Sequence, residues 1–215
     1  MRASEAQKIL RVILCFEVDY TSYATSVNDF CVADLQLPNT PSGYPCKSET
    51  NVTADDFVFS GFVPGSTILD PFNVTLTTAF VTSLPGLNRL GFSAAKGDFG
   101  INGTVPMHFH PDATELLIIV ESQLTAGFIT PAKVYLKIVK HGDIVVFPKG
   151  LLHFLVNTGV GKAVIFAALS STNPTMQILD YLLFGNDLST SIIANTTLLE
   201  VSQIMKLKAQ FDGRG

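Results

Sequence analysis

The stretch GTVPMHFHPDATE, residues 103–115, places two histidines two positions apart and a glutamate shortly after them. Side chains two apart on a β-strand point to the same face, so His108 and His110 can approach a common point. The Pro-Asp pair that follows permits a turn, after which a second strand can bring Glu115 back towards that point. This stretch therefore predicts two adjoining strands that carry a cluster of polar side chains.

A third histidine, His153, lies in FPKGLLHFLVN, residues 147–157, where a turn leads into another apolar strand. Three imidazoles and one carboxylate form a mixed nitrogen and oxygen set, which suits a divalent first-row metal and leaves open positions for water or substrate. Taken alone, His108 and His110 also fit two unrelated strand histidines, but the addition of Glu115 and His153 favours a metal site. The remaining histidine, His141, stands in a turn and is expected at the surface.

The sequence around these two stretches consists of short apolar runs separated by Gly and Pro. In KVYLKIVK, residues 133–140, Val134, Leu136 and Ile138 alternate with polar residues, which predicts a half-buried strand. Several such strands in succession indicate a sandwich or barrel. From Pro174 onward the apolar spacing becomes helical. Helices appended to a barrel usually cover a sheet edge or pack on a neighbouring subunit, and QILDYLLFGNDL, residues 177–188, leads us to expect oligomers.

Composition excludes several classes of protein. Apolar residues make up 47% of the 215-residue chain against 15% charged, which indicates a single folded domain with a substantial core. The formal net charge is −4, and no basic run exists, which argues against nucleic-acid partners and anionic membrane surfaces. No stretch approaches the roughly 20 apolar residues that a membrane span requires.

Residues 1–24 contain the parts of a secretory signal: basic residues, the apolar run ILRVILCF and a small-residue site ending at Ala24. An ordinary N-terminal arm is the alternative. Removal of this leader would take away Cys15 and leave Cys31 and Cys46, for which we predict a disulfide. Two reduced thiols would be expected instead in a cytosolic protein. Four glycosylation sequons also occur, at Asn51, Asn73, Asn102 and Asn195.

The stretch at 103–115 and GDIVVFPKGLLHFLVN, residues 142–157, resemble the two motifs of the cupin superfamily as they occur in plant germins and germin-like proteins. Gly142, Pro148, His153 and Asn157 match the spacing of the second motif. NDFCVADL, residues 28–35, is similar to the mature N-terminus of germins, with Cys46 at the place of their disulfide partner. The forms VPMHFHP, KVYLKIVKHGD and QILDYLLFGNDL look like the branch described as auxin-binding.

This resemblance implies an all-β cupin jelly-roll β-barrel with C-terminal α-helices, formed by a single germin-type domain over residues 25–215. It implies Mn²⁺ held by His108, His110, Glu115 and His153. It also implies a secreted glycoprotein of the apoplast, in the extracellular space or cell wall. The expected assembly is a homohexamer, built as a trimer of dimers.

The same resemblance leads to several functional hypotheses. Superoxide dismutase activity is the leading one, because many germin-like proteins have it. A non-catalytic protein that binds an aromatic carboxylate such as auxin on its metal, and a cell-wall or storage protein with a structural metal, remain alternatives. Oxalate oxidase is disfavoured because the two asparagines that hold oxalate in that enzyme are replaced here by Val105 and Ala95, which cannot donate hydrogen bonds.

Overall fold

The structure is a computed structural model, and it describes residues 30–63, 68–69 and 71–215. Residues Val32–Gly215 form one compact unit, and of the other unit, Met1–Cys31, only Phe30 and Cys31 are described. The predicted leader, residues 1–24, and Cys15 therefore lie outside the described residues. The start of the predicted domain at residue 25 stays a prediction.

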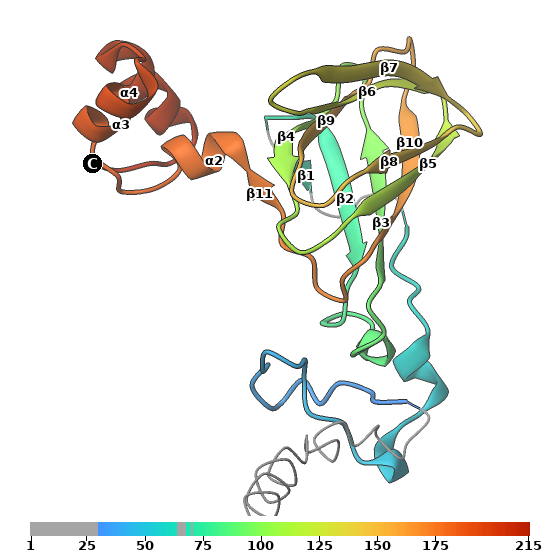
Figure 1. Cartoon of the computed structure of the whole chain (residues 1–215). Coiled ribbons are helices and arrows are strands. Elements are labelled where there is room, and N and C mark those ends of the chain that lie inside the picture. Colours follow the sequence, from blue (N-terminus) through green and yellow to red (C-terminus); the bar gives the residue numbers. More distant parts are fainter. Residues whose placement is uncertain (1–29, 64–67, 70) are drawn as a thin grey trace, which may run out of the picture. The chain divides into compact units, whose positions relative to one another are not determined.

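Eleven described strands form two antiparallel sheets that enclose one interior (Figure 1). The six-stranded sheet has the order β1 (Ile68–Leu69), β2 (Val74–Ala79), β3 (Ser93–Phe99), β10 (Ala163–Leu169), β5 (Glu115–Glu121) and β8 (Ile144–Phe147). The five-stranded sheet has the order β11 (Gln177–Ile178), β4 (Thr104–Phe109), β9 (Leu152–Val156), β6 (Gln123–Ile129) and β7 (Val134–Lys140). From β7 onward each successive strand lies in the other sheet, which is the jelly-roll arrangement that the sequence predicted.

Strand β5 shows why these residues form a barrel wall. Its side chains alternate, with Glu115, Leu117 and Ile119 buried and the residues between them largely exposed. The buried set joins a single apolar cluster that draws on both sheets and includes Phe99, Leu124, Phe147, Leu155 and Ile165. The period of two therefore separates a packed interior from an outer face.

Strand β7 is oriented differently from the expectation. Val134, Leu136 and Ile138, the apolar face predicted to be buried, are 54%, 60% and 62% exposed. The pairing with β6 explains the difference, because it sets Val139, which is buried, opposite buried Leu124. Residues at odd positions of β7 therefore share the inner face, and the apolar residues at even positions face outward.

Three short helices follow the last strand, as the C-terminal spacing predicted. They are α2 (Leu179–Phe184), α3 (Thr190–Thr197) and α4 (Val201–Gln210). Their own small core consists of Phe184, Ile193, Ile204 and Phe211. None of the helices in the described part of the chain has the length and apolar character that a bilayer crossing requires.

Three 3-10 turns, η2 (Glu49–Asn51), η3 (Ala54–Phe57) and η4 (Pro85–Leu87), precede β3. Between Val32 and η2 the chain doubles back, and the Lys47 N–H donates to the Val32 carbonyl over 2.8 Å. Cys31 and Cys46 are each disulfide-bonded. Their pairing with one another stays a prediction.

Asn157 closes the barrel end near β9. This residue ends the motif at residues 142–157, and its side chain is fully buried. Its side-chain amide donates to the carbonyls of Gly100 and Gly161, both over 2.8 Å, and its Oδ1 accepts from the Gly159 N–H over 3.0 Å. Its own N–H donates to the Gly103 carbonyl. Asn157 thus ties the turn before β4 to the turn after β9, and these two strands carry two of the predicted ligands, His108 and His153.

Replacement of Asn157 by Ala should therefore lower the free energy of unfolding by about 2–3 kcal/mol, because it removes three hydrogen bonds and leaves a buried gap. Chemical denaturation measures the change. Thr158→Ala, one residue along at an exposed position, is the matched control and should change stability by less than about 0.5 kcal/mol. Equal stability of the two variants would contradict the role assigned to Asn157.

Candidate metal centre

Three strands place the four predicted ligands around one point in the barrel. His108 lies on β4 directly opposite His153 on β9, and His110 follows the end of β4. Glu115 opens β5 in the other sheet. One ligand atom from each residue lies within 4.8 Å of every other, so the cluster is the size of a metal coordination sphere.

The cluster is enclosed by the apolar interior. The four side chains are all buried, the most exposed being Glu115 at 8%. The Phe147 ring stacks on the His153 imidazole at 4.4 Å between centroids and 23° between planes. These groups therefore cannot satisfy their lone pairs or charge with bulk water, and they must do so with one another or with a bound ion.

Each imidazole is held by its Nδ1 atom against a backbone carbonyl. His108 bonds to Pro106 over 2.8 Å, His110 to Thr175 over 2.8 Å and His153 to Leu151 over 2.7 Å. A carbonyl oxygen only accepts, so each Nδ1 carries a hydrogen and donates it. In the neutral ring the lone pair is then on Nε2, the atom turned towards the cluster, which is the tautomer a metal ligand needs.

Glu115 completes a set of atoms that all accept. Its Oε2 lies 3.1 Å from Nε2 of His153 and 3.3 Å from Nε2 of His110. At such distances a carboxylate oxygen and an imidazole lone pair repel unless a proton or a metal cation lies between them. Because the cluster is buried, a positive charge at its centre is required for its stability. The donor set fits a divalent first-row metal.

The pKa values of the cluster indicate where a proton goes. Burial, aided by nearby His153, lowers the pKa of His108 to about 3. Burial also opposes protonation of His110, but the hydrogen bond and charge of Glu115 outweigh it and raise its pKa. Burial opposes ionisation of Glu115, yet hydrogen bonds from His110 and His153 lower its pKa to about 2. A cation therefore competes mainly with a proton on His110.

Sequence reasoning missed the group that positions His110. Asp112, which we expected only in a turn, accepts from the Ser171 hydroxyl over 2.7 Å and the Thr175 N–H over 3.3 Å. The carbonyl of Thr175 is the atom that orients His110. Asp112 therefore holds the segment before β11 in place for this imidazole. Nothing in the local sequence pairs Asp112 with residues about sixty positions away.

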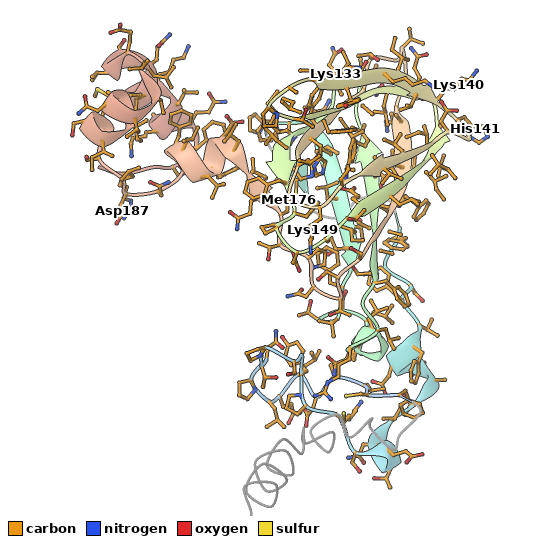
Figure 2. The ribbon with its side chains drawn as sticks, viewed as in Figure 1. Lys133, Lys140, His141, Lys149, Met176 and Asp187 are labelled. Carbon is orange, nitrogen blue, oxygen red and sulfur yellow. The ribbon has the colours of Figure 1, made fainter. Side chains whose placement is uncertain are left out.

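The other predicted residues lie apart from the cluster. His141 is exposed, as expected, and its Nδ1 contacts the Val120 carbonyl over 2.7 Å. Figure 2 shows His141 at the end of β7 nearest Lys140, with its side chain directed away from the barrel. The four sequon asparagines, Asn51, Asn73, Asn102 and Asn195, are all exposed. Val105 is buried in the barrel core, and Ala95 packs against that core from β3.

Comparisons with known proteins agree with this geometry. Residues 59–205 match the Cupin family model. The chain is 48% identical over 194 residues to the auxin-binding protein ABP19b of Prunus persica, which covers 90% of this chain and 92% of that protein. It is 42% identical over 208 residues to a germin-like protein of Morus alba, 96% of this chain and all of the other.

A solved structure of oxalate oxidase superposes with a TM-score of 0.78 at 33% identity, over 86% of this chain and 96% of that one. The fold, the clustered ligand set and these relatives together show that the chain belongs to the cupin family and, within it, to the germin-like proteins.

Proposed function

We propose that this chain is a secreted manganese-binding germin-like protein that removes superoxide at the site formed by His108, His110, Glu115 and His153. The observation that supports it best is the convergence of three Nε2 lone pairs and a carboxylate in a buried pocket. Bound manganese would supply one-electron chemistry, which converts two superoxide ions and two protons into dioxygen and hydrogen peroxide. Zinc or iron would also fit this ligand set.

The protein's own residues would fix and tune the ion. The three Nδ1–carbonyl hydrogen bonds hold each imidazole in the tautomer and orientation that ligation needs. Glu115 brings one negative charge against the ion, and Phe147 excludes water from the face of His153 on which it stacks. Four protein ligands would leave two positions of a six-coordinate ion for water or superoxide.

Two residues make oxalate oxidation a weaker proposal, despite the structural similarity of this chain to oxalate oxidase. The residues that would hold oxalate are Val105 and Ala95, and both are apolar. A dianion placed beside them would lose its hydration without gaining hydrogen bonds, so a productive position would be costly.

A second candidate function is metal-dependent binding of a small aromatic carboxylate. The relative from Prunus persica supports it, since it is named an auxin-binding protein. In this alternative the carboxylate would occupy the open positions on the metal, and binding would be lost when the metal is removed.

We also propose secretion to the apoplast, with the leader removed near Ala24, a disulfide between Cys31 and Cys46, and glycans on some of the exposed sequons. The predicted hexamer, a trimer of dimers, is supported by an exposed apolar surface. Leu116, Ile118 and Val120 on β5 lie on one outer face beside Ile144 and Val146 on β8, and these five are 37–62% exposed. A second copy of the chain would cover such a surface.

Removal of one ligand should release the metal. Purified protein should carry about one equivalent of Mn²⁺ per chain. His153→Ala should lower the metal affinity by at least about 100-fold, because mutation of a residue that only hydrogen-bonds to a metal ligand already lowers the affinity by about 10- to 100-fold. Elemental analysis with a chelator titration measures this, and circular dichroism verifies the fold of the variant. His141→Ala, a surface histidine, is the control. Undiminished manganese in His153→Ala would refute the assignment.

Metal affinity should fall on acidification. A metal displaces the proton that His110 holds, and Glu115 raises the pKa of this histidine above its usual value. Affinity should therefore decline by about tenfold per pH unit once the pH falls below the raised pKa of His110, which is at a higher pH than for an isolated histidine. Competition with a metal-binding dye between about pH 5 and 8 measures the slope. A constant affinity across this range would show that the imidazoles are not ligands.

The metal-loaded protein should remove superoxide faster than an equal concentration of free Mn²⁺, because the ligands hold the ion in one redox-active geometry. An indirect assay with a superoxide-generating system measures the rate per bound metal. His153→Ala should lose the activity together with its metal, and His141→Ala should retain both. A rate no higher than that of free Mn²⁺, in protein shown to hold a full equivalent, would reject dismutation while leaving the metal site intact.

A further inference from the structure

One buried hydroxyl group in the barrel has no hydrogen-bond partner in the protein. It belongs to Ser93, the first residue of β3, which is 1% exposed. Within residues 30–63, 68–69 and 71–215, Ser93 Oγ is the one side-chain nitrogen or oxygen atom that is shut off from solvent and forms no hydrogen bond. Folded proteins rarely leave such a group unsatisfied, because its lost hydration is then not replaced. Its partner is therefore expected from a molecule that enters the barrel.

The alternation of β3 directs this hydroxyl inward. Phe99 on the same strand belongs to the apolar interior, and Ala95 packs against that interior. Side chains two apart on a strand share a face, so Ser93 points to the same side as these two residues. The opposite face of β3 carries Lys96 and Asp98, which form an ion pair with each other. Ser93 is therefore the one polar side chain that the described strand β3 turns into the barrel.

Ser93 also lies level with a metal ligand across the six-stranded sheet. It pairs with Leu169 on β10, which in turn pairs with Glu115 on β5, and these three strands are neighbours (Figure 1). Adjacent strands are about 4.8 Å apart, so the Cα atoms of Ser93 and Glu115 are separated by about 10 Å. Both side chains are buried. The hydroxyl of Ser93 therefore belongs to the barrel wall beside the metal centre.

The charge and the enclosure of this centre indicate what the hydroxyl would bind. A divalent ion among three neutral imidazoles and the single carboxylate of Glu115 leaves a net positive charge, which attracts an anion. An anion accepts hydrogen bonds, and a serine hydroxyl can donate one. The residues next to Ser93 on the inner face are small, since Ala95 follows on β3 and pairs with Ala167. The buried position therefore suits an anion of few atoms.

We propose that Ser93 is a binding residue of the metal centre, whose hydroxyl donates a hydrogen bond to a small monoanion held beside the ion. The identity of this anion as superoxide rests on the function proposed above. Val105 and Ala95 offer no hydrogen-bond donor, so Ser93 is the donor that this wall of the barrel retains. One donor is enough to orient a monoanion of two or three atoms, whereas a dianion such as oxalate needs more.

Isothermal titration calorimetry of the manganese-loaded full chain with azide tests this role, because azide is a small monoanion like superoxide. Ser93→Ala should bind azide about tenfold more weakly, the loss expected for one hydrogen bond to a charged group, and should keep a full equivalent of metal. Thr77→Val is the matched control. It removes a buried hydroxyl from the outer face of the same sheet, opposite Lys96, and should leave the azide affinity unchanged.

Urea denaturation of the manganese-loaded chain without azide separates this role from a structural one. Ser93→Ala should be at least as stable as the wild type, because the change removes a buried hydroxyl that has no partner in the protein. A clear loss of stability would show that the hydroxyl is bonded within the protein, and the inference would then be wrong.

The azide titration also distinguishes this inference from the proposed function. Equal affinity of Ser93→Ala and wild type at full metal content would overturn the inference and leave superoxide removal untouched, as when the hydroxyl holds only an ordered water. Wild-type protein that holds manganese and binds no azide would overturn it as well. Azide binding that depends on Ser93, in protein that removes superoxide no faster than free Mn²⁺, would support the inference and reject dismutation.

Discussion

The structure depends on one electrostatic constraint. Four electron-pair donors are buried at one point of an apolar barrel, where they repel one another unless a positive charge lies between them. Nε2 of three imidazoles and an oxygen of Glu115 meet there, and each imidazole has its other nitrogen committed to a backbone carbonyl. Such a group is stable only around a positive charge. The folded chain therefore contains a preformed cation site, whose cost in desolvation is offset when an ion binds.

The jelly roll can gather these four donors around one point because its two sheets supply them from opposite sides. Pairing of His108 with His153 brings two strands of one sheet together, and Glu115 comes from the facing sheet. Small polar residues keep these strands in register. Asn157 joins the turns at one end, and Asp112 fixes the segment that orients His110 at the other. Ligand geometry is thus maintained by side chains that never approach the ion.

Much of this arrangement was predictable from the sequence, because it depends on local periodicity. The two-residue spacing of His108 and His110 determines that they share a face, and the motif around His153 supplied the third imidazole. The change from period two to helical spacing after Pro174 identified the C-terminal helices. The role of Asp112 was not predictable, because it depends on contacts with residues distant in the chain. The orientation of β7 was also missed. An alternating sequence shows that the two faces of a strand differ, but it does not show which face points into the barrel, and for β7 this is fixed only by its pairing with β6.

The orientation of β7 has a consequence for how copies of this chain meet. An edge strand with Val134, Leu136 and Ile138 on its outer face would readily recruit a strand from any partly unfolded neighbour. Lys133 and Lys137, turned inward along the same edge, hinder that pairing, because a strand added there would have to bury their charges. The outer face of β7 therefore stays apolar and exposed, while the inward lysines disfavour pairing at its hydrogen-bonding edge. The strand therefore permits association of folded surfaces and discourages the continuous sheet that leads to fibrils.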